Sequence, residues 1–222
     1  MKKIKNTMLN NTKKISMIGI NGSPHKGHTL ELLKLTIKEA GRRGAKTEII
    51  NVYDYKISSH SGELDPKNYR DGLNDDMVKL QEKILIADGI VFSSPTHWFN
   101  MSGQMKNFID RLTAAEDFGF LLEGKVAGVI AYGPQGGAFN NALLIAGTLN
   151  QMGMVIPPYG FIFDEGRNDD WVEKDCKLLA KNILEQIKIG TKSKWGYDED
   201  KYDRSPIEII AKDEENKNKK IR

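Results

Sequence analysis

Short apolar segments alternate with helical periodicities along most of the chain, and this alternation restricts the fold more than any other feature. Between the apolar segments, hydrophobic residues recur at the spacing of amphipathic helices. Apolar strands that read as continuous runs and alternate with helices predict a parallel sheet covered on both faces. The five predicted strands cover residues 15–20, 47–52, 89–93, 126–132, and an interrupted pair of segments, 154–156 with 161–163.

The order of these strands follows from their connections. Pro157 and Pro158 interrupt the fifth strand, and proline is tolerated in strands at the edge of a sheet rather than in its centre. Five strand–helix units with the fifth strand at an edge fit the order 2-1-3-4-5. The predicted fold class is therefore α/β, a flavodoxin-like three-layer sandwich around a five-stranded parallel sheet. The helices are expected over residues 30–40, 77–87, 101–112, 141–151 and 170–189.

Charge and length divide the chain into three parts. Residues 1–14 hold five lysines and no acidic residue, and we predict a basic N-terminal arm. Residues 15–190 form the flavodoxin-like domain. The charged tail, 191–222, also carries three aromatic residues and an apolar cluster at 207–210, so we interpret it as an oligomerisation arm rather than a solvated tail. The polar segment 55–74 is long for a connection, and we interpret it as a lid or a lost binding element.

Composition excludes several classes of function. The formal net charge of +3 belongs to the arm, because residues 15–222 hold 28 basic and 30 acidic side chains. Because the charges of residues 15–222 nearly balance, this part of the chain lacks the basic surface that nucleic-acid binding requires. No apolar run approaches the roughly 20 residues of a membrane span, and the N-terminus lacks the features of a secretory signal. We therefore expect a cytoplasmic protein with no membrane partner.

Three unusual loops follow the first, third and fourth predicted strands. They cover residues 21–29, 93–100 and 132–138. In an open parallel sheet, ligands bind beyond the carboxyl ends of the strands, at the point where the strand order reverses. For the predicted order this point lies between the first and third strands. We therefore expect the three loops to surround one ligand.

The loop at 21–29 is suited to a single phosphate. It contains two glycines, two hydroxyls and two imidazoles just before a predicted helix, and helix N-termini bind anions. A plain strand–helix turn is the alternative. His28 stands where a P-loop requires lysine, and no G-x-G-x-x-G pattern is present, so neither a nucleoside triphosphate nor a dinucleotide is favoured.

The other two loops are suited to a flat heteroaromatic ring. Trp98 and Phe99 stand at a strand-to-helix corner, although either aromatic alone could belong to the core, with Asn100 as a helix N-cap. Residues 133–137 contain three glycines, which allow the backbone to lie against a planar ligand, whereas a simple left-handed turn needs one. A phosphate site next to a ring site describes flavin mononucleotide (FMN).

The three loops resemble those of the NAD(P)H-dependent FMN reductase family, a flavodoxin-like group that includes iron–sulfur flavoproteins. The likeness rests on GSPHKG at 22–27, on SPTHWFNMSGQMKNFIDRL at 94–112 and on 133–137, and it extends over about residues 15–165. The second motif is the most specific of the three. The family often has arginine where this chain has His25.

The resemblance implies a set of FMN-binding residues and no catalytic side chain. On the phosphate side, these are Ser23, His25, Lys26, His28 and Thr29. Around the isoalloxazine ring, they are Pro95, Thr96, His97, Trp98, Phe99 and Asn100, with Gly133, Gln135, Gly136 and Gly137 on its far side.

The iron–sulfur relatives carry a cysteine cluster after the second strand. Here residues 58–61 read Ser-Ser-His-Ser, and the single cysteine, Cys176, lies on the apolar stripe of the last helix. Hydroxyls do not replace thiolates as cluster ligands, so we expect neither an iron–sulfur cluster nor another bound metal. One cysteine also excludes an intrachain disulfide.

The predicted function is that of an FMN-dependent NAD(P)H oxidoreductase. A nicotinamide gives a hydride to FMN and leaves, and a small acceptor of the quinone, flavin, azo or metal-ion type then takes the electrons. The resemblance also implies a homodimer or homotetramer. One alternative is a flavodoxin-type electron carrier, although such carriers are usually strongly acidic. The other is a phosphate-binding protein without flavin, supported by the loop at 21–29 alone.

Overall fold

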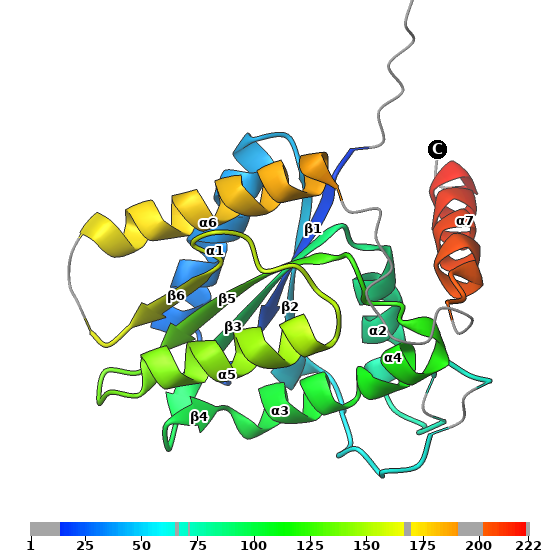
Figure 1. Cartoon of the computed structure of the whole chain (residues 1–222), viewed down its shortest axis with the longest axis horizontal. Coiled ribbons are helices and arrows are strands. Elements are labelled where there is room, and N and C mark those ends of the chain that lie inside the picture. Colours follow the sequence, from blue (N-terminus) through cyan, green and yellow to red (C-terminus); the bar gives the residue numbers. More distant parts are fainter. Residues whose placement is uncertain (1–13, 65–66, 71, 167–169, 191–201, 221–222) are drawn as a thin grey trace, which may run out of the picture.

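The computed structural model describes residues 14–64, 67–70, 72–166, 170–190 and 202–220. A parallel sheet forms the middle of three layers (Figure 1). Its strand order is β2-β1-β3-β5-β6, which confirms the predicted order and the flavodoxin-like fold. The predicted basic arm lies outside the described residues, except for Lys14. The parallel strands are β1 (Ser16–Asn21), β2 (Lys46–Asn51), β3 (Gly89–His97), β5 (Val126–Tyr132) and β6 (Phe161–Asp164).

The sheet has six strands rather than the five predicted. The additional strand is β4 (Asn100–Met101), which pairs antiparallel with the end of β3. The fifth predicted strand lies at the edge, as expected, and is reduced to β6, because Val155 forms only an isolated bridge with Val126. The central strands β3 and β5 are buried on both faces along most of their length, which explains their continuous apolar sequences.

Helices cover both faces of the sheet. Helices α1 and α6 lie together on one face, and α2, α3 and α5 lie on the other (Figure 1). The predicted helix over 101–112 begins later, since Ser102 is its N-cap, and a separate short helix follows it. The helices are α1 (His28–Arg42), α2 (Met77–Ile86), α3 (Gly103–Asp110), α4 (Thr113–Gly119), α5 (Ala138–Gln151), α6 (Asp170–Ile189) and α7 (Ser205–Lys220), with a 3-10 turn at Val52–Asp54.

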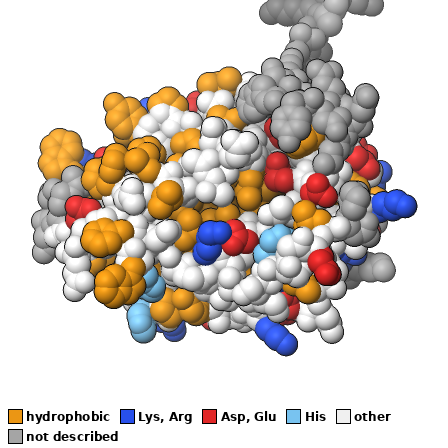
Figure 2. Space-filling model, turned by 60° about the horizontal axis from the view of Figure 1, so that its bottom comes forward, with side chains coloured by type: hydrophobic (Ala, Val, Ile, Leu, Met, Phe, Trp, Pro, Cys, Tyr) orange, Lys and Arg blue, Asp and Glu red, His pale blue; other side chains and the backbone are white. Residues whose placement is uncertain are grey.

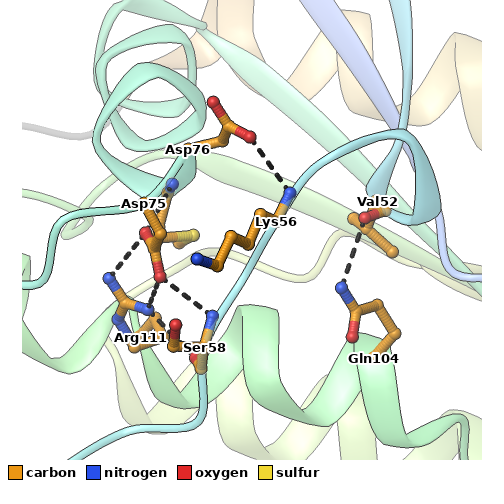
Figure 3. Close-up of polar contacts among 8 residues, drawn as sticks. Val52, Lys56, Ser58, Asp75, Asp76, Gln104 and Arg111 are labelled. Carbon is orange, nitrogen blue, oxygen red and sulfur yellow. Dashed lines mark hydrogen bonds and ion pairs between the residues drawn. The ribbon is translucent and has the colours of Figure 1, made fainter.

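The polar segment after β2 is held at both ends by a buried ion pair (Figure 3). The guanidinium of Arg111 lies 2.7 Å from a carboxylate oxygen of Asp75, and both side chains are almost fully buried. The same guanidinium donates to the Ser58 carbonyl, while the Ser58 N–H donates to Asp75. Neighbouring Asp76 accepts from the Lys56 N–H. These contacts tie the segment to α2 and to the end of α3.

The described part of the C-terminal tail packs against its own chain. Helix α7 lies beside α2 (Figure 1), and Ile210 is buried in the main core. The Tyr202 hydroxyl donates to a carboxylate oxygen of Glu123, and the Arg204 guanidinium donates to the carbonyls of Leu121 and Glu123. The aromatic residues at 195 and 197 lie outside the described residues. A role for the tail between subunits stays a prediction.

Candidate functional site

The three loops meet at the carboxyl edge of the sheet, because β1, β3 and β5 are adjacent parallel strands. The Gly22 N–H donates to the Ser93 carbonyl at 2.7 Å, and the Gly22 carbonyl accepts from the Ser102 hydroxyl at 2.7 Å. On the other side, Gly133 of the third loop packs against Thr96 near the end of β3, and Gly137 packs against Phe99 just after it. The structure therefore brings the loops together, as predicted.

The turn before α1 leaves the first backbone N–H groups of the helix without a side-chain cap. Ser23 is buried, and its hydroxyl oxygen accepts from the His25 N–H at 3.2 Å, which fixes the turn. Gly27 is the N-cap of α1, and no side chain caps the helix. Uncapped helix N-termini carry partial positive charge and prefer anions. Lys26 is exposed beside this N-terminus, and Thr29 is buried in the first turn of α1.

His28 links α1 to the end of β6. Its Nε2 atom lies 2.7 Å from a carboxylate oxygen of Asp164, whose side chain is fully buried. Its ring stands 4.5 Å from the Tyr132 ring, centroid to centroid, and Nδ1 is 3.6 Å from a Glu31 carboxylate oxygen. The histidine is thus oriented by a carboxylate. Sequence reasoning missed Asp164, although an acid at the carboxyl end of the apolar run FIFD was a signal for it.

The predicted loop over 93–100 is mostly a β-hairpin. Strand β3 continues to His97, and the hairpin pairs His97 with Asn100. Trp98 and Phe99 form its two-residue turn, both with positive φ (51° and 62°), as type I′ turns require. Their side chains are 95% and 59% exposed, so the alternative of core aromatics is wrong. Asn100 is not a helix N-cap; Ser102 fills that role, accepting from the Met105 N–H.

The glycine loop after β5 lies directly against this hairpin. A Cβ atom on Gly137 would stand 2.5 Å from the Phe99 ring, and the residue also has a φ of +82°. A Cβ atom on Gly133 would stand 2.6 Å from Cβ of Thr96. Gly136 has a φ of +95°, and Gln135 is exposed. Both a close approach and a left-handed backbone therefore require glycine at 137.

The hairpin and the glycine loop form the two walls of a cleft of about 650 Å³. This volume lies within the usual range for ligand sites, and aromatic rings and flat backbone are the surfaces on which a planar heterocycle packs. The residues present thus fit a flavin ring. The cleft is lined by Thr96, His97, Trp98, Phe99, Gln135 and Gly136. The other predicted residues are not part of this lining: Ser23, His25, Lys26, His28 and Thr29 lie around the α1 N-terminus, Pro95 and Asn100 in the hairpin strands, and Gly133 and Gly137 against Thr96 and Phe99.

An uncapped helix N-terminus after β1, beside a cleft formed at the carboxyl ends of β3 and β5, is a feature of flavodoxin-like α/β proteins. The family model described as NADPH-dependent FMN reductase matches residues 15–168. The chain belongs to this family and is a flavin oxidoreductase. Membership supports FMN and NADPH as its cofactor and co-substrate.

Individual relatives agree with this assignment. An iron-sulfur flavoprotein of Archaeoglobus fulgidus is 32% identical over 191 residues, which cover 77% of this chain and 94% of the relative. RosB, solved with a bound 8-demethyl-8-formylriboflavin-5'-phosphate intermediate, superposes with a TM-score of 0.66 at 19% identity over 79% of each chain. A flavone reductase gives 0.62 at 22% identity, covering 78% of this chain and 63% of the other. The two structural likenesses show the fold alone.

Cys176 is buried between α6 and α1, away from the cleft. Burial raises the pKa of its thiol to about 11, which suits a packing residue rather than a thiolate ligand. Across the described ranges, we find no cluster of three or more histidine, cysteine or acidic side chains arranged to hold a metal ion. In the same ranges, every helix is too short or too polar to cross a membrane.

Proposed function

We propose that this protein binds FMN at the carboxyl edge of the sheet, with the phosphate at the α1 N-terminus and the ring in the hairpin cleft. The observation that carries the proposal is that the uncapped α1 N-terminus, the aromatic hairpin and the glycine loop lie at the same edge of three adjacent strands, with His28 beside the Tyr132 ring and Gly137 against Phe99. Ser23 and Thr29, with the backbone N–H groups between them, would hold the phosphate. Thr96, Trp98 and Gly136 would hold the ring.

The bound flavin would supply the redox chemistry, accepting a hydride from NAD(P)H and passing electrons to a small acceptor. The protein binds and orients the ring, and the exposed hairpin tip leaves room for a nicotinamide and an acceptor in turn. No side chain needs to act as an acid or base. Asp164 fixes the imidazole of His28 through Nε2, and His28 would be one of the residues that hold the phosphate.

Spectroscopy of the purified chain tests the proposal. Apoprotein titrated with FMN should quench flavin fluorescence and shift the visible spectrum, and riboflavin should bind more weakly because it lacks the phosphate. The FMN-loaded protein should oxidise NADH or NADPH in the presence of a quinone or ferric salt. Absence of flavin binding, or a loaded protein that oxidises neither nucleotide, would contradict the proposal.

We also propose that this chain works without an iron–sulfur cluster. The name of its A. fulgidus relative indicates such a cluster in that protein. The support is compositional, because the whole sequence contains one cysteine and an iron–sulfur cluster of the usual kind needs four thiolates. Anaerobically purified protein should show the flavin spectrum without stoichiometric iron. Stoichiometric iron and acid-labile sulfide would contradict this proposal.

A further inference from the structure

Asn141 lies behind the cleft wall and holds the end of β3. It is fully buried in the first turns of α5, and sequence reasoning did not single it out. Its Nδ2 atom donates to the Pro95 carbonyl at 3.3 Å and to the Thr96 hydroxyl oxygen at 3.1 Å. Thr96 lines the cleft, so this buried amide contacts a residue of the proposed flavin site directly.

The contacts fix which end of the amide faces β3. The Pro95 carbonyl can only accept a hydrogen bond, so the NH₂ group must face it. Because the same nitrogen lies next to the Thr96 hydroxyl, its second proton goes to that oxygen. The polarity of the chain of hydrogen bonds is therefore set: the amide donates, and the threonine oxygen accepts.

This polarity leaves the hydroxyl proton of Thr96 for the cleft. Within the described part of the chain, that hydroxyl donates to no acceptor. The side chain is also held in place, because Gly133 packs so closely that a Cβ there would stand 2.6 Å from Cβ of Thr96. Because this oxygen accepts from Asn141 and Thr96 lines the cleft, the O–H group is available as a donor to a ligand in the cleft.

The carbonyl end of the Asn141 amide indicates that this residue has a role beyond packing. The Oδ1 atom of Asn141 is buried and has no partner among the described residues. An unpaired buried carbonyl oxygen is unfavourable, and an apolar side chain at this position would avoid it. Stability of the core alone therefore does not explain an asparagine here.

We propose that Asn141 is a positioning residue, which orients the Thr96 hydroxyl as a hydrogen-bond donor to an acceptor atom on the edge of the flavin ring. This inference rests on the proposed function. It states that in one contact with the ring the protein donates the hydrogen bond and the flavin accepts it. A flavin ring carries carbonyl oxygens and unprotonated nitrogens at its polar edge, and these accept such a bond. The contact is to the ring, so the phosphate plays no part in it.

Flavin titrations of four variants test this role. Thr96→Val removes the hydroxyl with little change of shape, and Thr96→Ser keeps it. Asn141→Leu removes the orienting amide, and the double variant Thr96→Val/Asn141→Leu measures the coupling. Asn150→Ala is the matched control, since Asn150 lies at the other end of α5 and bonds the Met154 carbonyl. The dissociation constants of FMN and riboflavin, the visible spectra of the bound flavins and the apoprotein melting temperatures are measured for each.

We expect Thr96→Val and Asn141→Leu each to weaken FMN and riboflavin by the same factor, about five-fold, as for one neutral hydrogen bond. Thr96→Ser and the control should stay within two-fold of wild type. The double variant should be no weaker than the weaker single variant, because the amide acts through the hydroxyl. Unchanged flavin affinity in Thr96→Val, or multiplying effects in the double variant, would overturn the inference while the wild type still binds FMN. A wild type that binds neither flavin would overturn the proposed function itself.

Discussion

The buried pair of Asp75 and Arg111 makes the stability of this protein sensitive to acid. Burial disfavours the ionised form of Asp75, but hydrogen bonds from Arg111 and from the Ser58 and Met77 N–H groups outweigh it and hold the pKa of this carboxyl well below its usual range. A carboxyl whose pKa is lower in the folded state stabilises the protein above its unfolded-state pKa, near 4. Its contribution is lost as the pH falls below that value towards the folded-state pKa.

We expect Asp75→Asn to destabilise the protein by about 3–5 kcal/mol at pH 7, because it leaves the guanidinium of Arg111 buried without its charge partner. Urea unfolding at pH 7 and pH 3 measures this loss. The variant should also lose less stability than wild type between those two pH values. Asp76→Asn is the matched control: this carboxylate also accepts from a backbone N–H of the segment, that of Lys56, but its cation Lys79 is exposed rather than buried. Equal losses for the two variants would contradict the prediction.

Gly137 combines a left-handed backbone with contact to the hairpin. We expect Gly137→Ala to cost about 1–2 kcal/mol from the positive φ alone. FMN affinity should fall at least ten-fold, because the new Cβ would push the Phe99 ring and backbone. Gly147→Ala on α5, where a Cβ meets nothing within 4 Å, should instead stabilise by about 1 kcal/mol. Chemical unfolding and FMN titration of both variants check the contrast.

At the scale of elements, the hairpin shows why part of the site could not be predicted. Its turn residues are Trp98 and Phe99 rather than the Asn-Gly pair that signals a type I′ turn, and Pro95 argues against a strand. The pattern of apolar residues and turn residues therefore indicated a loop. Pairing with β4 and the close approach of Gly137 are tertiary effects, and they hold the two aromatic residues in their strained backbone conformation.

Helix α7 is expected to stabilise the domain without contributing to the flavin site. Ile210→Ala should cost about 2 kcal/mol, because this side chain is buried against the core next to α2. Ile209→Ala is the control, with a side chain that is 58% exposed, and should change stability little. Flavin affinity should be the same in both. A loss of flavin binding in Ile210→Ala would show that the tail supports the site.

For the whole molecule, the sequence predicted the layers and the strand order, since these follow from patterns that are local in the chain. Strand 126–132 was predicted at its observed bounds. The turn before α1 was predicted from the glycine and hydroxyl residues that come just before a helix. Asn141 and Asp164 were missed because their roles depend on partners 45 and 136 positions away. Packing against distant residues, rather than local propensity, placed them in the site.

An apolar surface on α5 bears on the predicted homo-oligomer. Figure 2 shows hydrophobic side chains gathered on the face that carries α5 and the hairpin. The helix has no charged residue, in a chain that is 28% charged, and Phe139, Leu143 and Leu144 are each more than 40% exposed. An uncharged apolar face can meet its own copy around a two-fold axis without repulsion. We propose that a second copy of the chain covers it.

Light scattering tests this proposal. Wild type should exceed the 25.0 kDa of one chain, and Leu143→Lys/Leu144→Lys should return it to that mass. Ile189→Lys is the control, because this residue is 77% exposed at the end of α6, on the opposite layer. A monomeric wild type, or an unchanged mass in the double variant, would contradict the proposal.

Asp164, which the sequence analysis did not single out, contacts several parts of the candidate site. Its carboxylate contacts His28 and the Gly166 N–H, and its carbonyl accepts from the Gly133 N–H. One residue thereby joins the turn before α1, the edge strand and the glycine loop. Separating the α1 N-terminus from the glycine loop would break two bonds to this residue, those with His28 and with the Gly133 N–H.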